Sequence, residues 1–133
     1  MKHAPSSPSL IIRGFSLVEV LAAIAIIGIV TFLAIPNIVS IKEDGERNLA
    51  ISRVEALNMA VVAYYQKGGS SAVTSWSDSD NDGRYVLIAP YLAFAPSSLT
   101  AYMPGGYTAT LPTSLPPTSK TVLKGPGNTS IPY

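Results

Sequence analysis

One apolar stretch near the start of the chain limits what the sequence can fold into. Every residue from 15 to 35 is apolar or small, with the single exception of Glu19. As an α-helix this stretch would be about 30 Å long, at about 1.5 Å per residue, which matches the hydrocarbon core of a bilayer. The sequence therefore predicts a transmembrane helix at about residues 15–36, with one carboxylate near its start.

The residues before this stretch are basic and end in a glycine. They include Lys2 and Arg13 and no acid, so the positive-inside tendency keeps them cytoplasmic and sends the C-terminal part across the membrane. A secretory signal peptide has its cleavage site after its apolar region. Here the candidate cleavage residue, Gly14, precedes it. A cleaved leader, residues 1–14, and an uncleaved signal anchor both fit this pattern.

The order of residues from Gly14 to Glu19 distinguishes between these two interpretations. Gly14-Phe15-Ser16-Leu17-Val18-Glu19 has a glycine, an aromatic residue, and a glutamate five residues into an apolar helix. This order resembles the prepilin motif of type IV pilins and of the pseudopilins of type II secretion systems. The resemblance extends from Arg13 to about Ile41. It implies that a prepilin peptidase cuts between Gly14 and Phe15 and then N-methylates Phe15.

Glu19 is a candidate functional residue because a carboxylate is costly inside a membrane. The cost is roughly 2.5–3.5 kcal/mol at the bilayer centre, and the helix dipole offsets only about 0.3–1 kcal/mol of it. The new α-amino group of Phe15 on a neighbouring chain would supply a partner in a low dielectric. We expect Glu19 to pair with a neighbour's N-terminus during filament assembly. The alternative is that its side chain reaches the headgroup region.

Two residues further along the stretch weaken a helix. Gly28 costs about 1 kcal/mol relative to alanine, and Pro36 removes a backbone hydrogen bond and kinks the helix. The family resemblance implies local unwinding between them when subunits pack into a filament. A simple kink at Pro36 accounts for the same residues.

Beyond Pro36 the pattern becomes that of an amphipathic helix. Apolar residues recur at spacings of three and four and share one helical face: Ala50, Val54, Leu57, Val61 and the pair Tyr64 and Tyr65. Gly68 and Gly69 are a stop signal after Lys67. The sequence therefore predicts one long helix, residues 15–67, whose outer half needs a cover.

The remaining chain, residues 68–133, is rich in turn formers and predicts a small sheet. Candidate strands are Arg84–Ile88, Gly106–Leu111 and Thr121–Lys124, and residues 90–92 are expected to form a turn or a single helical turn. We expect the aromatic residues to form the core rather than a ligand-binding surface. A small antiparallel sheet packed on a long helix is an α+β fold, and the pilin resemblance implies the same shape.

One segment of the sequence suggests a metal-binding site. Asp78, Asp80 and Asp82 alternate and are followed by Gly83, as in the first half of an EF-hand calcium loop. The twelfth position, where a bidentate glutamate belongs, is Ala89. Some pseudopilins have calcium ligands in their outer loops, so the three aspartates are candidate calcium ligands. The alternative is a solvated, Asp-rich turn, and we expect no other cofactor.

Composition argues against several classes of function. The chain has no cysteine and one histidine, His3, which argues against disulfides, thiolate metal sites and histidine-based catalysis. We therefore expect no enzyme activity. The formal net charge is +1 and no basic patch is visible, so the sequence does not favour nucleic-acid binding or a DNA-uptake pilin.

Taken with the resemblance, these features predict a structural subunit of a type IV pilus or of a type II secretion pseudopilus. The resemblance implies four kinds of partner: other pilins, a prepilin peptidase, an assembly ATPase and a membrane platform protein. It also implies a single-pass protein of the bacterial inner membrane, with its C-terminal domain periplasmic or extracellular, that later joins a filament. The alternative is a monomeric, membrane-anchored binding module.

Overall fold

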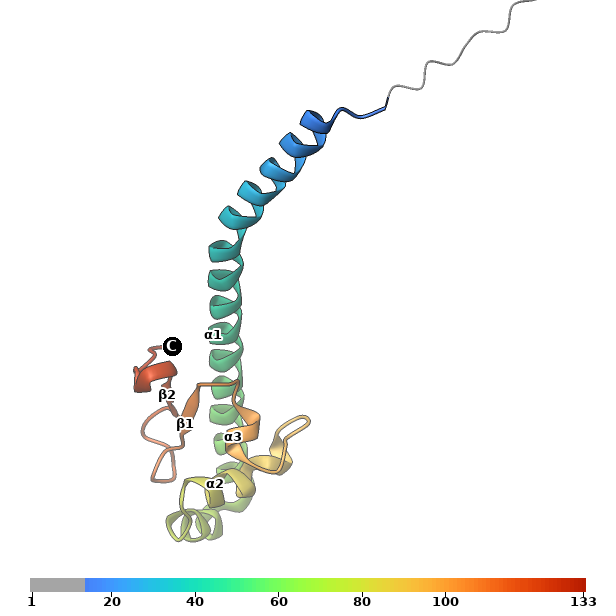
Figure 1. The fold of residues 1–133 in the computed structure, drawn as a ribbon. Helices are drawn as coiled ribbons and strands as arrows, with labels where there is room; N and C mark the ends of the chain where they lie inside the picture. The colour runs from blue at the N-terminus through green and yellow to red at the C-terminus, as the bar shows by residue number, and fades with distance from the viewer. Residues whose placement is uncertain (1–13) are drawn as a thin grey trace, which may run out of the picture. The chain divides into compact units, whose positions relative to one another are not determined.

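The computed structural model describes residues 14–133, so the leader predicted at residues 1–14 lies outside the described residues except for Gly14. The chain divides into two compact units between Ser40 and Ile41. We call the described residues 14–40 the N-terminal unit and residues 41–133 the C-terminal unit. Helix α1 (Leu17–Ser77) contributes residues to both units (Figure 1).

In the N-terminal unit the residues from Leu17 onward belong to α1, and their apolar side chains are exposed. The large apolar side chains from Leu17 to Val39 are between 49% and 77% exposed. An 18-residue window of α1 has a mean hydropathy of 2.7, and none of that window is buried. By length and composition the helix is therefore a candidate membrane span.

In the C-terminal unit α1 has the buried face that the sequence predicts. Its fully buried residues before Gly69 follow spacings of three and four: Ala50, Val54, Leu57, Ala60 and Val61. Tyr64 and Tyr65, predicted on the same face, are partly buried against this core. The amphipathic pattern is thus confirmed, and the cover comes from the C-terminal unit's own chain.

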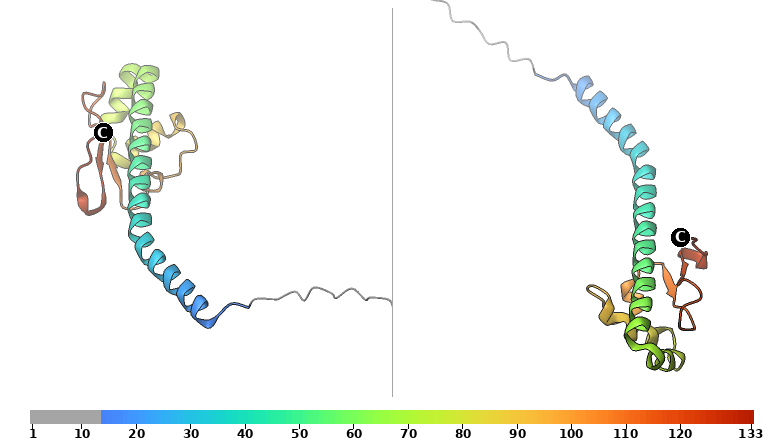
Figure 2. Two further views of the ribbon diagram at one scale, coloured as in Figure 1. Left: turned by 90° about the horizontal axis from the view of Figure 1, so that it is seen from above. Right: turned by 180° about the vertical axis from the view of Figure 1, so that it is seen from behind.

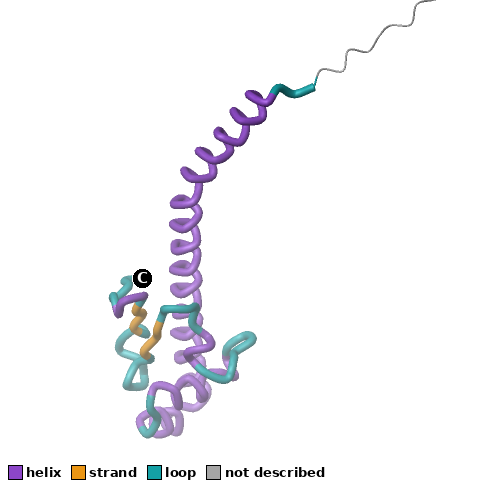
Figure 3. The backbone as a smooth tube through the Cα atoms, viewed as in Figure 1, coloured by secondary structure: helices purple, strands orange, loops and turns teal. Residues whose placement is uncertain are grey.

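Gly69 interrupts α1, but helical structure continues beyond it. Its backbone has φ 52° and ψ −128°, a conformation that residues with a Cβ rarely adopt. The sequence predicted that the helix ends at about Lys67 and is followed by a loop. Instead, helical residues resume and reach Ser77 (Figure 3). Ala72 and Trp76, four residues apart, are both buried, so this second helical segment has a core-facing side of its own.

Helix α2 (Asn81–Ile88) occupies the place of a predicted strand, and the prediction of a strand at Arg84–Ile88 is wrong. Aromatic and β-branched residues in that segment favour a strand. A helix forms instead because Asp80 caps its start, accepting the Gly83 N–H at 2.8 Å. Tyr85 and Ile88, three residues apart, are then both buried on one face.

The other two predicted strands are present and form a two-stranded antiparallel sheet. Strand β1 (Thr108–Thr110) pairs with β2 (Val122–Lys124), with Ala109 opposite Leu123. Both lie inside the predicted ranges. Short helices complete the unit: η1 (Ala89–Tyr91), α3 (Leu99–Tyr102) and η2 (Pro126–Asn128). The turn or single helical turn predicted at residues 90–92 corresponds to η1, and the α+β fold class is confirmed.

The core of the C-terminal unit lies between α1 and the segments that follow it. Its largest fully buried side chains come from α1, α2, β2 and the residue that follows β1: Trp76, Tyr85, Leu57, Ile88, Leu111 and Leu123. The Trp76 indole N–H donates a hydrogen bond of 2.9 Å to the Pro112 carbonyl, which gives this buried polar group a partner. Most aromatic residues are thus in or against the core, as expected, but Phe94 is fully exposed.

Candidate processing and assembly site

The predicted cleavage junction is open. Gly14 and Phe15 precede α1, and the Phe15 side chain is 90% exposed. A Cβ added at Gly14 would meet no other atom within 4 Å. The backbone at this junction is therefore accessible to an enzyme that has to approach it closely.

Ser16 and Glu19 form a capping box at the start of α1. The Ser16 backbone N–H donates to Glu19 Oε2 at 2.7 Å, and the Glu19 backbone N–H donates to Ser16 Oγ at 3.2 Å. Two backbone donors that a helix start would otherwise leave unpaired are satisfied in this way. Sequence reasoning missed the capping box, although the spacing Ser-x-x-Glu before an apolar run was a signal for it.

The capping box holds the Glu19 carboxylate at the first turn of the apolar helix. A carboxylate has about four acceptor positions, and Ser16 occupies one of those of Glu19. The remaining positions can accept an ammonium group from another molecule. Negative charge is also favoured at this end of a helix. The Glu19 carboxylate therefore lies four residues after Phe15 of the predicted cleavage junction, and acceptor positions of it are left over.

Gly28 and Pro36 both lie within α1. A Cβ at Gly28 would meet no atom within 4 Å outside the helix's own backbone. Pro36 has no N–H, so one hydrogen bond of the helix is missing there. Between them, Thr31 Oγ1 donates to the Ile27 carbonyl at 2.8 Å, a bond of the kind that often bends helices. Only Pro36 removes a backbone hydrogen bond in this segment, and the one residue of α1 with a non-helical backbone is Gly69.

The Asp-rich segment begins a helix. Asp78 lies in a turn, Asp80 is the N-cap of α2 and Asp82 lies in its first turn, and all three are exposed. Within residues 14–133 no three His, Cys, Asp or Glu side chains come together in a way that could hold a metal ion. This arrangement corresponds to the solvated turn and gives no support to calcium binding by the three aspartates.

Asn81, between these aspartates, joins α2 to β1. Its side-chain amide donates to the Ala109 carbonyl at 3.1 Å, and its Oδ1 accepts the Leu111 N–H at 2.8 Å. The Asn81 side chain therefore supplies backbone hydrogen-bond partners that no neighbouring strand supplies along this edge of β1. Sequence reasoning missed this role, and the segment offers no local signal for it because the partners are about 30 residues away.

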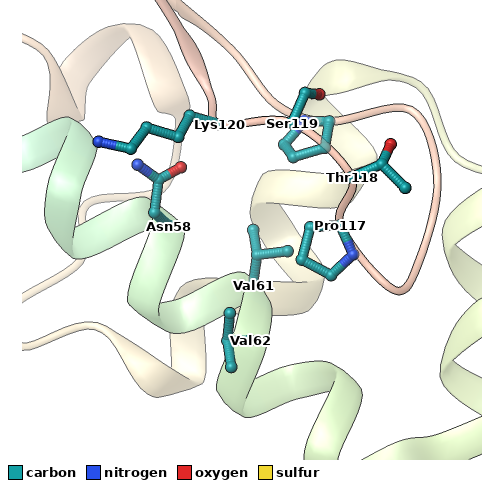
Figure 4. A pocket seen from close by; sticks show the side chains of 8 residues that line it. Asn58, Val61, Val62, Pro117, Thr118, Ser119 and Lys120 are labelled. Carbon is teal, nitrogen blue, oxygen red and sulfur yellow. The ribbon is translucent and has the colours of Figure 1, made fainter. Parts of the chain in front are cut away.

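A pocket of about 290 Å³ lies between α1 and the segment 112–120 (Figure 4). Val61, Val62, Pro112 and Pro117 form its apolar lining, and the polar lining comes from Asn58, Thr118, Ser119 and Lys120. Lys120 is paired with Glu55, at 3.3 Å between Nζ and Oε1. The pocket therefore combines an apolar floor with a positively charged residue.

Three tyrosines of the C-terminal unit have raised pKa values. Burial raises the pKa of Tyr85 above its ordinary 10.0, and the neighbouring Tyr102 adds to the effect. Burial also raises the pKa of Tyr102, against the opposing effect of Arg53. For Tyr133 burial raises the pKa, although its hydrogen bond with Asn58 lowers it. Each phenol is thus favoured in its neutral form in the folded protein.

The described residues thus contain an exposed Gly-Phe junction, a capped apolar helix with one acid near its start, and a small α+β unit. The first part of this arrangement also matches a known family: residues 12–35 match the model of the prokaryotic N-terminal methylation motif. The resemblance found in the sequence is thereby confirmed.

The individual proteins that match the chain share a more specific name. The chain is 38% identical over 52 residues to the type II secretion system core protein G of Escherichia coli, which is 39% of this chain and 36% of that protein. It is 36% identical over 52 residues to the protein of the same name from Pectobacterium carotovorum, which is 39% of this chain and 33% of the relative.

The corresponding Aeromonas hydrophila protein is matched over a longer range. There the identity is 33% over 100 residues, which is 74% of this chain and 64% of that protein. The chain spans about a third of the length of the first relatives that it matches. No solved structure gives a significant match.

Proposed function

We propose that this chain is a structural subunit of a type II secretion pseudopilus that polymerises through its apolar N-terminal helix. The observation that carries the proposal is the capped helix start beside an open Gly14-Phe15 junction, followed by an apolar helix that the described residues 14–133 leave exposed. The similarity to type II secretion system core proteins favours a pseudopilus over a type IV pilus. The proposed role is structural and involves no catalysis.

Processing comes first in this proposal. A prepilin peptidase cuts between Gly14 and Phe15 and methylates the new N-terminus, which leaves Phe15 as the first residue. Before assembly the chain spans the bacterial inner membrane once, with the leader cytoplasmic and the C-terminal unit on the other side. The motif match over residues 12–35 and the hydropathy of α1 support both parts of this proposal.

In the assembled filament, Glu19 binds the N-terminus of a neighbouring chain. The exposed junction and the free acceptor positions of the Glu19 carboxylate support this pairing. Gly28 and Pro36 allow the helix between them to loosen as subunits pack, because glycine lowers the helix propensity and proline removes one backbone hydrogen bond. Assembly also needs an ATPase, a platform protein in the membrane and other pilins.

The alternative is a monomeric binding module held in the membrane by the same helix. A lone helix of this composition is stable in lipid without any protein partner. In a monomeric anchor Glu19 would serve only to cap the start of the helix, a role that needs no second chain. We favour the polymer proposal because the chain is similar to type II secretion system core proteins.

The test compares Glu19→Ala with Glu43→Ala in cells that have a type II secretion system. Glu43 is an exposed acid of α1 beyond the apolar stretch and serves as the matched control. We expect mass spectrometry of the native protein and of both variants to find an N-methylated Phe15 at the N-terminus. We expect filaments in the sheared fraction from the native protein and from Glu43→Ala, whereas Glu19→Ala remains in the membrane.

Two results would contradict the proposal. One is a native protein that retains Met1 with no methylated Phe15. The other is a normal yield of filaments from Glu19→Ala, because the carboxylate would then have no part in assembly. A native chain that is processed but never found in a filament would favour the monomeric module.

A further inference from the structure

A second pocket of the C-terminal unit, of about 350 Å³, lies where α1 meets the loop between η1 and α3. Both views of Figure 2 show this loop beside α1. The pocket shares no lining residue with the one between α1 and the segment 112–120. Its lining contains one charged residue, Arg53 of α1, and otherwise only apolar and aromatic residues: Ala93, Phe94, Pro96, Ala101 and Tyr102.

Two contacts with Tyr102 hold the Arg53 guanidinium in place. Its Nη1 donates a hydrogen bond to the Tyr102 carbonyl, at the end of α3. Its Cζ also lies 5.5 Å from the centroid of the Tyr102 ring, which is a cation–π distance. A guanidinium that is fixed before a ligand arrives loses less side-chain entropy when the ligand binds.

The positive charge of Arg53 has no acidic partner among the described residues. The two ion pairs of these residues lie elsewhere, at Lys42 with Glu46 and at Lys120 with Glu55. A guanidinium has five N–H donors, and the structure gives Arg53 a single hydrogen bond. The remaining donors are free to take an anion, and a planar carboxylate fits the fork of a guanidinium with two parallel bonds.

Phe94 adds an aromatic ring to this pocket at a position that the isolated fold does not favour. The side chain is 101% exposed, and the backbone has φ 56°, where a bulky residue is strained. Hydrogen bonds close the loop on both sides, from the Leu92 N–H to the Ala89 carbonyl at 3.0 Å and from the Tyr85 hydroxyl to the Pro96 carbonyl at 2.9 Å. An exposed ring lacks the stabilisation of burial, and a ligand that covers it would supply that stabilisation.

We propose that this pocket binds a carboxylate that carries an aromatic or other apolar group. Arg53 binds the carboxylate, and the rings of Phe94 and Tyr102 contact the apolar group. An inorganic anion would leave the apolar lining in water, and an uncharged ligand would not use the charge of Arg53. This inference concerns the C-terminal unit alone and goes beyond the proposed polymerisation.

NMR titration of the ¹⁵N-labelled, detergent-solubilised chain tests the site with three probes. N-acetyl-phenylalanine represents the end of a peptide chain, and 3-phenylpropionate represents a free acid. N-acetyl-phenylalaninamide has the same ring without a carboxylate and is the control. We expect an acid at millimolar concentration to shift the Arg53 side-chain signal and the Tyr102 amide signal in a saturable way, and the amide to shift neither.

The two acids distinguish the sources of the ligand. Binding of N-acetyl-phenylalanine alone would support the proposal and identify the end of a peptide chain. Binding of 3-phenylpropionate, alone or with the other acid, would support it and show that a free acid is sufficient. No saturable shift from either acid, or an equal shift from the amide, would overturn the proposal.

Substitution of Arg53 tests which group binds the carboxylate. Arg53→Gln should weaken the binding of the acid about tenfold or more, because a charged hydrogen-bond donor is lost. Arg53→Lys should restore only part of the affinity, since an ammonium group cannot form two parallel bonds. The matched control is Arg47→Gln, at an exposed arginine of the same helix, which should bind as the native chain does. Native affinity in Arg53→Gln would overturn the proposal.

Ala101→Leu separates binding from folding, because Arg53→Gln also loses the hydrogen bond to the Tyr102 carbonyl. Ala101 is exposed and lines the pocket, and leucine is a good helix former. The variant should therefore keep the native melting temperature and lose affinity for the acid, because its side chain fills the pocket. Native affinity would overturn the assignment of this pocket. No measurement here requires a filament, so failure of this proposal leaves the proposed function standing, and the reverse also holds.

Discussion

The two halves of α1 differ in what covers them. In the C-terminal unit the helix buries Val54, Leu57 and Val61 completely against its own chain. In the N-terminal unit Leu21, Ile27 and Phe32 are 54%, 63% and 76% exposed. One helix thus combines a half that is satisfied within the monomer and a half whose apolar side chains need lipid or another protein.

The covered and the uncovered half of α1 should therefore respond differently to substitution. Substitutions in the covered half should change the stability of the monomer, because its partners are present in the same chain. Substitutions in the uncovered half should change membrane insertion or assembly and leave the fold of the C-terminal unit intact. The four predictions below test this division, from the largest expected effect to the smallest.

Trp76→Ala should destabilise the C-terminal unit most. The indole is fully buried and donates a hydrogen bond to the Pro112 carbonyl. Removing a buried aromatic side chain of this size costs about 3–5 kcal/mol. Denaturant unfolding of the detergent-solubilised chain, followed by the near-ultraviolet circular dichroism of its tyrosines, measures the loss. The matched control is Phe32→Ala, which should leave this transition unchanged; an equal loss from both variants would refute the division.

Asn81→Ala should have the next largest effect. It leaves the Ala109 carbonyl and the Leu111 N–H without their side-chain partner. Unpaired groups of this kind cost about 1–3 kcal/mol. Asn48→Ala, at an exposed position of α1, should change stability by no more than about 0.5 kcal/mol. Equal unfolding midpoints for the two variants would show that Asn81 does not support β1.

Alkaline pH should destabilise only the C-terminal unit. The folded-state pKa values of Tyr85, Tyr102 and Tyr133 are raised above 10.0. The stabilisation from the neutral phenols is therefore complete below pH 10.0 and is lost as pH rises through the folded-state values. Residues 14–40 contain no tyrosine. Tyrosinate absorbance should rise together with unfolding of the C-terminal unit, while the helicity of the N-terminal unit persists. Tyrosinate formation without any loss of stability would contradict this prediction.

Phe94→Gly should produce the smallest change, and it should be a gain. Relief of the positive φ is expected to stabilise the chain by about 1 kcal/mol. Val86→Gly, also at an exposed apolar residue but inside α2, should lose roughly 0.5–1 kcal/mol. Thermal unfolding of the two variants in parallel measures the opposite signs. A loss at Phe94 equal to that at Val86 would show that the loop is not strained.

The long-range pattern of this fold was predictable, because it depends on periodicity. The apolar run and the spacing of Ala50, Val54, Leu57 and Val61 define α1 and its buried face without any knowledge of the rest. The two strands were recognisable because turn-forming residues bound them. The cleavage junction and Glu19 came from the motif, and their roles in processing and assembly stay predictions.

Where prediction failed, tertiary contacts decided between local alternatives. The segment Arg84–Ile88 has the composition of a strand, yet the Asp80 cap and the burial of Tyr85 select a helix. Gly69 does break α1, as a glycine there suggests, but burial of Trp76 makes the following residues helical again. The alternating aspartates left a calcium loop and a solvated turn both open, and calcium binding by them stays a prediction; in the structure Asp80 is the N-cap of α2.

The hydrogen bond from the Ser16 N–H to Glu19 has one further consequence for assembly. A free glutamate samples many rotamers, and ordering a rotamer-rich side chain at an interface costs about 0.5–1.5 kcal/mol. In this chain the bond has already selected a rotamer before any neighbour arrives. In the proposed filament, an incoming amino terminus would meet a carboxylate that is already ordered, so that less side-chain entropy is lost on binding.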